Sequence, residues 1–157
     1  MGATVVEVFT GTLPGAPLRA VAEAHLEAGR GLVGDRYYTG AGTFSGTLHG
    51  KPDVEVTLIE VEEIRRFNEA QPIPSAPWEF RRNIVTNGVR LNDLVGRRFS
   101  VGGAVLEGIR LCEPCSHLSK LMNPAVLQGM VHRAGLRARV VSGAVIRPGD
   151  EIHSDLS

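Results

Sequence analysis

The sequence is poor in cysteine, has no excess of either charge and contains no long apolar run. Its only two cysteines lie three positions apart, so a disulfide framework like that of small secreted domains is excluded. Lysine plus arginine and aspartate plus glutamate both number 17, whereas nucleic-acid binders usually carry a basic excess. No apolar run approaches the ~18 residues of a membrane span, and the first residues lack the features of a secretory signal. We therefore expect a cytoplasmic protein with no nucleic-acid or membrane partner.

Length and composition indicate one globular domain. The chain has 157 residues, of which 43% are hydrophobic. A chain of this length can bury a core without a disulfide or a structural metal. Its 19 glycines and 9 prolines are scattered, and no repeat or long linker interrupts the pattern. We predict a single domain over residues 1–157.

Short segments rich in valine, isoleucine and leucine recur along the chain, separated by turn residues. The alternation predicts strands at residues 4–9, 18–27, 54–59, 83–86, 91–95, 98–101, 104–109, 135–141, 144–146 and 151–153. Segment 18–27 alternates only loosely, and a short helix is the alternative reading there. Asn87-Gly88 and Gly102-Gly103 predict hairpin turns.

Helical patterns are few and short. Val61, Ile64 and Phe67 are spaced by three, which predicts a helix over 60–68 that ends before the proline-rich segment 72–77. Two further short helices are predicted at 116–122 and 124–130. Because helices do not alternate regularly with strands, we predict a mainly β fold, a barrel or sandwich with a few short peripheral helices.

The most informative motif is Cys112-Glu-Pro-Cys115, followed by Ser116 and His117. A thiolate is a strong nucleophile and a soft metal ligand, and a position just before a helix favours the thiolate form. Three other readings stay open. In the first, the pair forms half of a structural zinc site, although no second CxxC exists to complete it. In the second, it is a redox pair, although the βαβ context is absent. In the third, both cysteines are buried hydrophobic residues.

Two further clusters combine glycine or aromatic residues with arginine. Gly31 to Tyr37 contains Asp35 and Arg36, and it is either a plain glycine-rich turn or a loop that offers a guanidinium to an anion. Residues 80–84 place two arginines and Asn83 before an apolar strand. They either guard an exposed edge or form a polar rim around a ligand.

Taken in order, these clusters resemble the MOSC domain, the module named for the C-terminal part of molybdenum cofactor sulfurase. The resemblance rests on Gly34-Asp35-Arg36, Val56-Thr57-Leu58-Ile59, Phe80-Arg81-Arg82-Asn83-Ile84, Leu91-Asn92-Asp93-Leu94-Val95-Gly96, Cys112-Glu113-Pro114-Cys115, Gly135-Leu136-Arg137-Ala138 and Gly149-Asp150. It spans nearly the whole chain. It implies a β-barrel like the barrel domain of pyruvate kinase, and a role in binding the molybdenum cofactor (molybdopterin) or in carrying sulfur for it.

The resemblance also implies roles for individual residues. Cys115 matches the cysteine that ligates molybdenum in amidoxime-reducing members, and Cys112 matches the first cysteine of the same motif. The arginines that grip the cofactor phosphate there are matched by Arg36 and Arg81. Asn83 matches the asparagine of a Phe-Arg-Pro-Asn motif, and Thr12 falls where those members have a serine.

This sequence departs from those members at two places. Arg82 replaces the proline of Phe-Arg-Pro-Asn, and Glu113-Pro114 replaces a Ser-Arg pair before the ligand cysteine. The Pro-Cys-Ser-His version is similar to that of small stand-alone bacterial members. The anion-binding arginines around the cofactor are therefore expected to differ in part from those of the reductases.

Three functional hypotheses follow. The first is a molybdenum-cofactor-dependent oxidoreductase that reduces N-oxygenated small molecules with electrons from a separate donor protein, because the chain shows no flavin or iron–sulfur motif. The second is a sulfur carrier that holds a persulfide on Cys115 after loading by a sulfur donor. The third is a non-catalytic binding domain with a buried structural CxxC.

Overall fold

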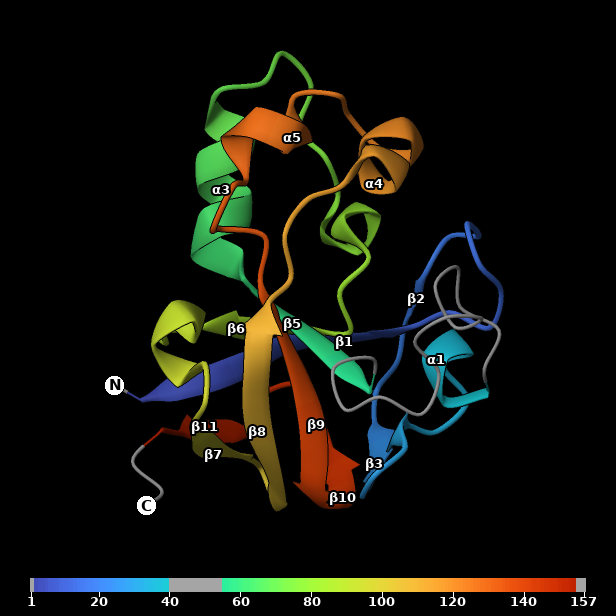
Figure 1. Ribbon diagram of the computed structural model, residues 1–157, viewed down its shortest axis with the longest axis vertical. Helices are drawn as coiled ribbons and strands as arrows, with labels where there is room; N and C mark the ends of the chain where they lie inside the picture. Colours follow the sequence, from blue (N-terminus) through green and yellow to red (C-terminus); the bar gives the residue numbers. More distant parts are fainter. Residues whose placement is uncertain (1, 40–54, 155–157) are drawn as a thin grey trace.

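The computed structural model describes residues 2–39 and 55–154, and it is mainly β (Figure 1). The strands are β1 (Ala3–Thr10), β2 (Arg19–Ala20), β3 (Ala24–Glu27), β4 (Gly31–Leu32), β5 (Val56–Glu60), β6 (Ile84–Asn87), β7 (Arg98–Val101), β8 (Ala104–Leu111), β9 (Leu136–Ser142), β10 (Ala144–Ile146) and β11 (Glu151–His153). The helices are α1 (Arg36–Thr39), α3 (Val61–Glu69), α4 (Ser116–Leu121), α5 (Val126–Gly129) and the 3₁₀ helices η2 (Pro77–Phe80) and η3 (Leu91–Leu94).

Seven strands close into a barrel in the order β11-β7-β8-β9-β5-β6-β1, because β11 also pairs with β1. Among the described barrel pairs, β5–β6 is parallel and the others are antiparallel. β2 extends β1 beyond the barrel, and a small second sheet has the order β10-β3-β4. The predicted mainly β barrel with short helices is thus confirmed.

Strand alternation divides the apolar residues between two cores. Side chains such as Leu58 and Leu136 point into the barrel, where nothing of them is exposed. Their neighbours along the strands, such as Ile59 and Val85, belong to a second core that lies under the helices. The barrel wall is therefore buried on both faces where the helices cover it.

α3 contributes three buried residues to the second core. Its Val61, Ile64 and Phe67 are buried at the predicted spacing, and Phe67 packs edge-on against Phe80 with ring centroids 5.7 Å apart. α3, α4 and α5 gather at one end of the barrel (Figure 1). We call this group the helical cap, and its contact with the barrel wall frames the candidate site. Within the described residues no helix is long and apolar enough to cross a bilayer.

Two local predictions were wrong. Asn87-Gly88 is not a hairpin turn, because β6 pairs with β1 and β5 and the chain then enters η3. Gly88 has a φ of 80°, so the dipeptide marks a turn without a following partner strand. Segment 91–95 is mainly the 3₁₀ helix η3 rather than a strand, and its three-residue spacing buries Leu91 and Leu94 together.

Other local predictions are confirmed. For segment 18–27 the strand prediction is confirmed only in part: it contains no helix, but it forms two short strands, β2 and β3, instead of one. β2 pairs with β1, whereas β3 pairs with β10 and β4. Gly102-Gly103 joins β7 to β8 as a hairpin, with Val101 opposite Ala104. The predicted helices after Cys115 and after Pro124 exist, although α5 is only four residues long.

Candidate functional site

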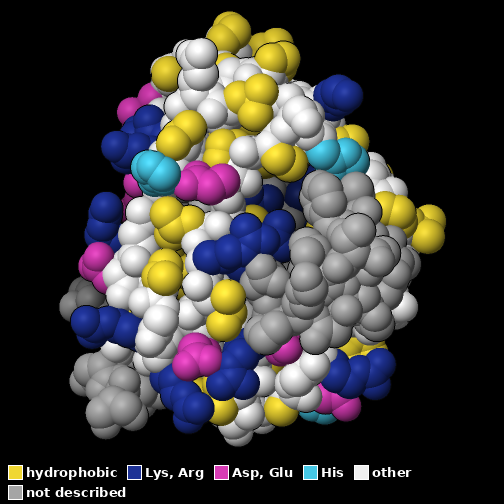
Figure 2. Space-filling model, viewed as in Figure 1, with side chains coloured by type: hydrophobic (Ala, Val, Ile, Leu, Met, Phe, Trp, Pro, Cys, Tyr) yellow, Lys and Arg dark blue, Asp and Glu magenta, His cyan; other side chains and the backbone are white. Residues whose placement is uncertain are grey.

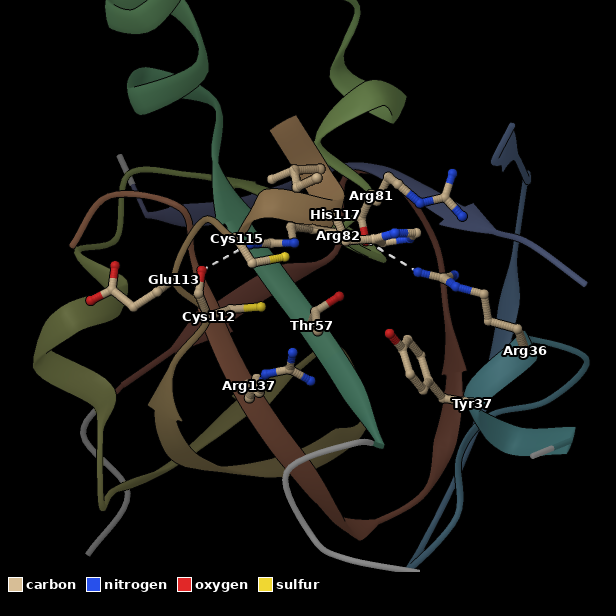
Figure 3. A pocket seen from close by; sticks show the side chains of 11 residues that line it. Arg36, Tyr37, Thr57, Arg81, Arg82, Cys112, Glu113, Cys115, His117 and Arg137 are labelled. Atoms are coloured by element: carbon tan, nitrogen blue, oxygen red, sulfur yellow. Dashed lines mark hydrogen bonds between the residues drawn. The ribbon is translucent and has the colours of Figure 1, made fainter. Parts of the chain in front are cut away.

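Both cysteines open into one cavity between the outer barrel wall and the helical cap (Figure 3). Its lining residues are Arg36, Tyr37, Thr57, Arg81, Arg82, Cys112, Glu113, Cys115, His117, Leu118 and Arg137. The cavity is partly open to solvent and measures about 50 Å³, room for a few water molecules. Four of the lining residues were singled out from the sequence as site residues: Cys112, Cys115, Arg36 and Arg81.

Cys115 caps the N-terminus of α4, as the sequence predicted. Its backbone is extended, and its carbonyl accepts a hydrogen bond from the Ser119 amide at 3.0 Å, which closes the first helical turn. The side chain is partly exposed and its sulfur faces the cavity (Figure 3). Cys115 is thus a half-buried residue that packs against the second core and presents its sulfur to this cavity.

Cys112 lies deeper, with 2% of its surface exposed, and its sulfur faces the same space (Figure 3). Its amide donates to the Gly135 carbonyl at 2.8 Å, and its carbonyl accepts from Arg82 at 2.8 Å. Both cysteines are free thiols. The backbone at Cys112 is thus anchored to two other segments, while the side chain is directed into the cavity.

Asp35 is completely buried and positions Arg36. One carboxylate oxygen accepts from the Gly11 amide at 3.1 Å, from Arg36 Nη1 at 3.2 Å and from Asn83 Nδ2 at 3.2 Å. Arg36 also donates to the Arg81 carbonyl at 3.4 Å. The buried ion pair fixes the guanidinium of Arg36 at the cavity wall facing the cysteines (Figure 3).

Asn83 acts behind the cavity wall. Its side-chain oxygen accepts from the amide and the hydroxyl of Thr57, at 3.1 and 3.2 Å, and its amide group donates to the Phe9 carbonyl as well as to Asp35. Only 1% of its surface is exposed, and it does not line the cavity. The structure therefore places this predicted cofactor ligand in contact with the residue that positions Arg36.

Thr12 lies outside the cysteine cavity. It lines a separate hollow of about 230 Å³ together with Thr10, Gly11, Ala16, Pro17, Arg19, Ala20 and Val21. Of the six predicted site residues, the structure thus brings four together at the cavity, with Asn83 directly behind its wall and Thr12 in the neighbouring hollow.

Arg81 adds a second partly buried cation beside Arg36. Its backbone is left-handed, with a φ of 63°, and its guanidinium donates to the Ala16 carbonyl at 2.6 Å. Burial and the neighbouring Arg36 guanidinium lower the pKa of Arg81 below its ordinary value. Two cations held this close favour an anionic ligand, because an anion would relieve their repulsion.

Arg82 is a structural arginine. Its guanidinium donates to three backbone carbonyls: to Ala134 at 2.8 Å, to Phe80 at 3.2 Å and to Cys112 at 2.8 Å. It is 8% exposed. It therefore links the η2–β6 loop to the cysteine loop and to the segment before β9. From the sequence, Arg82 was read as part of an exposed charged edge or a ligand rim and as a departure from the family motif, and its structural role was not predicted.

Sequence reasoning also did not assign Thr57, Tyr37, Arg137 and His117 to this site. Thr57 and Arg137 are partners across β5 and β9, and both point outward from the barrel. Strand alternation predicts which face each residue takes, but not that both strands border this cavity.

Tyr37 stacks on Arg36, with the guanidinium carbon 4.7 Å from the ring centroid.

The cavity is electropositive. Its lining contains four arginines and one carboxylate, that of Glu113. Glu113 accepts from the His132 amide at 2.7 Å and points away from the sulfurs (Figure 3). Lysine or arginine side chains lie in and beside the central hollow in the space-filling view (Figure 2). We therefore expect the cavity to attract anions.

The described residues do not form a site for a bare metal ion. They contain no group of three or more histidine, cysteine or carboxylate side chains able to hold one. The structural-zinc reading of the CxxC therefore has no support among residues 2–39 and 55–154. A metal bound at Cys115 would have to arrive with most of its ligands already attached.

A family model of the MOSC domain matches residues 45–153. The chain belongs to the MOSC family, whose domains in general bind the molybdenum cofactor.

Solved structures share the fold at low sequence identity. The YuaD protein from Bacillus subtilis superposes with a TM-score of 0.81 at 18% identity, covering 99% of this chain and 98% of that one. YiiM from Geobacillus stearothermophilus has a TM-score of 0.72 at 18% identity, and the match covers 98% of this chain and 75% of YiiM. YiiM from Escherichia coli has a TM-score of 0.70 at 21% identity, and the match covers 100% of this chain and 71% of YiiM. A search of curated proteins found no match.

Proposed function

We propose that this chain binds the molybdenum cofactor in the cysteine cavity, with Cys115 as the protein ligand of the metal. The observation that carries the proposal is that the half-buried Cys115 lines one cavity together with Arg36 and Arg81. Molybdenum at high valence accepts a soft thiolate in addition to the two pterin sulfurs. The two guanidinium groups are suited to the cofactor phosphate.

The residues present fit this group. A cofactor that brings its own sulfur ligands needs one protein thiolate, and no bare-ion site exists among the described residues. The cavity measures about 50 Å³, so the larger part of the cofactor would lie outside it. We assign Arg36 and Arg81 to the anionic end, and Asp35 with Asn83 to holding Arg36 in place.

The reaction we propose is the reduction of N-oxygenated compounds such as hydroxylamines. The N–O bond breaks, the oxygen leaves as water, and the balance requires two electrons and two protons. The cofactor would supply the two-electron redox chemistry. A separate electron-donor protein would supply the electrons, and the chain's own residues would bind the substrate beside Cys115.

A sulfur carrier is the second candidate, favoured by the two thiols that face one cavity. Cys115 would hold the persulfide. Attack by the Cys112 thiol on its inner sulfur would form a disulfide and release hydrosulfide. In this role the arginines would stabilise the anionic persulfide rather than a phosphate.

One preparation separates the candidates. The protein is produced in a host competent for molybdenum cofactor synthesis, and bound molybdenum, bound pterin and protein mass are measured. We expect molybdenum and pterin near one per chain in the wild type. Cys115→Ser should lose the metal, and the matched variant Cys112→Ser should retain most of it. The loaded protein should then reduce a hydroxylamine with a chemical reductant.

Other outcomes refute the first proposal. An added sulfur atom on Cys115 without molybdenum favours the sulfur carrier. A protein with neither molybdenum nor added sulfur, in which Cys115→Ser changes no binding, favours a non-catalytic binding domain.

A further inference from the structure

Two adjacent tyrosines of α1 take different directions from the backbone. Tyr37 lines the cysteine cavity and stacks on Arg36, with the guanidinium carbon 4.7 Å from the ring centroid. Its hydroxyl points into the cavity, across from the two cysteine sulfurs (Figure 3). Tyr38 stacks on Arg30 instead, at 4.2 Å, and is not among the described residues that line the cavity. Only the first of this pair therefore offers its hydroxyl to the site.

Asp35 fixes both Arg36 and Tyr37 at the cavity wall. Its Oδ1 accepts a hydrogen bond from Arg36 Nη1 at 3.2 Å, and its Oδ2 accepts one from the Tyr37 amide at 3.3 Å. The Thr39 amide donates to the Asp35 carbonyl at 3.1 Å, which closes the turn of α1. Asp35 is completely buried. One buried carboxylate thus sets the position of the guanidinium and of the backbone that carries the stacked ring.

The Tyr37 hydroxyl is a hydrogen-bond donor at the cavity. Within residues 2–39 and 55–154 this hydroxyl forms no hydrogen bond, whereas the Thr57 hydroxyl, which also lines the cavity, is bonded to Asn83. A phenolic hydroxyl donates one hydrogen bond, and a guanidinium has five N–H donors. Arg36 therefore has more to offer than the bonds it makes to Asp35 and to the carbonyl of residue 81.

We propose that the Tyr37 hydroxyl donates a hydrogen bond to a phosphate group that is bound by Arg36, with Arg81 as the second cation of the site. A phosphate monoester presents three strong acceptor oxygens, so it takes donors from several directions at once. A hydroxyl and a guanidinium held side by side suit two of these oxygens. The inference rests on the proposed function where it takes this phosphate to be that of the cofactor.

The first test uses the full chain without cofactor, and its probe is inorganic phosphate. Binding is measured by isothermal titration calorimetry at constant ionic strength, so that general screening does not change during the titration. Tyr37→Phe keeps the ring that stacks on Arg36 and removes only the hydroxyl. We expect the dissociation constant for phosphate to be about tenfold higher in Tyr37→Phe than in the wild type, the lower end of what a hydrogen bond to a charged group contributes.

The matched control is Tyr38→Phe, which removes a hydroxyl from the next residue of the same helix. Its dissociation constant for phosphate should stay within about twofold of the wild-type value. The thermal midpoint of Tyr37→Phe should stay within about 2 °C of the wild type, because its hydroxyl bonds to no described residue. Equal phosphate affinity in the wild type and Tyr37→Phe would overturn the proposal. So would an equal loss in both variants, or a wild type that binds no phosphate.

The second test asks whether the phosphate is that of the cofactor. The wild type and both variants are produced in a host competent for molybdenum cofactor synthesis, and the pterin retained during dialysis is measured per chain. We expect Tyr37→Phe to lose pterin about tenfold faster than the wild type and Tyr38→Phe, since affinity differences among variants act mostly on dissociation.

The two proposals fail in different ways in this experiment. Equal pterin retention in the wild type and Tyr37→Phe overturns the inference for the cofactor and leaves the proposed function standing. A wild type that holds no pterin overturns the proposed function. In that case the phosphate titration alone decides whether Tyr37 binds a free phosphate or a different phosphate ester.

Discussion

Arg82→Met tests how the cysteine loop is held. The guanidinium makes three hydrogen bonds to buried carbonyls, two of them at 2.8 Å. A hydrogen bond to a charged group contributes about 1.5–3 kcal/mol, and an orphaned buried acceptor costs about 1–3 kcal/mol. Relief from burying a charge offsets part of this loss. We expect the free energy of unfolding to fall by about 3–5 kcal/mol, a large share of the 5–15 kcal/mol typical of a domain.

The assay is urea unfolding followed by circular dichroism, supported by the thermal midpoint. At about 2–4 °C per kcal/mol for a chain of this size, the midpoint should drop by about 6–20 °C. The stability of Arg82→Lys should lie between that of the wild type and that of Arg82→Met, because one ammonium group cannot reach all three carbonyls. The control Arg97→Met changes an exposed arginine and should stay within about 0.5 kcal/mol of wild type. If Arg82→Met unfolds like this control, the three hydrogen bonds do not hold the loop.

Further predictions concern two glycines and one buried carboxylate. Gly135 and Gly149 both have positive φ, but an added Cβ at Gly135 would overlap the Leu58 carbonyl oxygen, whereas Gly149 faces open space. In urea titrations the free energy of unfolding should fall by about 3 kcal/mol or more in Gly135→Ala and by about 1–2 kcal/mol in Gly149→Ala. Equal losses in the two variants would contradict the steric overlap at Gly135. Burial raises the pKa of Glu55, which accepts a hydrogen bond from the Val140 amide. A raised folded-state pKa means that stability falls as pH rises from the unfolded pKa through the folded one. The urea midpoint of Glu55→Gln should therefore increase relative to that of the wild type as pH rises from 4 to 7. A difference between the two midpoints that does not change with pH would refute this.

The sequence predicted most strands because their periodicity and turn residues are local signals. Segment 4–9 lies within β1, segments 98–101 and 144–146 coincide with β7 and β10, and segment 135–141 is offset from β9 by one residue at each end. The mistakes have non-local causes. Asn87-Gly88 resembles a hairpin turn, yet the partners of β6 are β1 and β5, which no dipeptide reveals. In 91–95, the three-residue spacing of Leu91 and Leu94 was the missed signal for a 3₁₀ helix.

The site was predicted unevenly for a similar reason. The CxxC is contiguous, so both cysteines could be found from the sequence and the structure places both at one cavity. Arg82 could not be understood there, since its three carbonyl partners come from residues 80, 112 and 134. Arg137 was noted only within the Gly135–Ala138 stretch that resembles the family, and its place at the cavity depends on β9 lying beside β5. The three-dimensional arrangement that brings these distant segments to the wall of the cysteine cavity could not be predicted from local patterns.

Barrel closure by β1 and β11 has a consequence for how the chain folds during synthesis. The final pairing joins Ala3 to Ile152, so the ring stays open until residues 151–153 have left the ribosome. Until then β1 and β7 each present an unpaired edge on which another nascent chain can add. Contacts of such wide sequence separation also form slowly. Premature release that removes β11 should therefore yield aggregates rather than a smaller folded barrel.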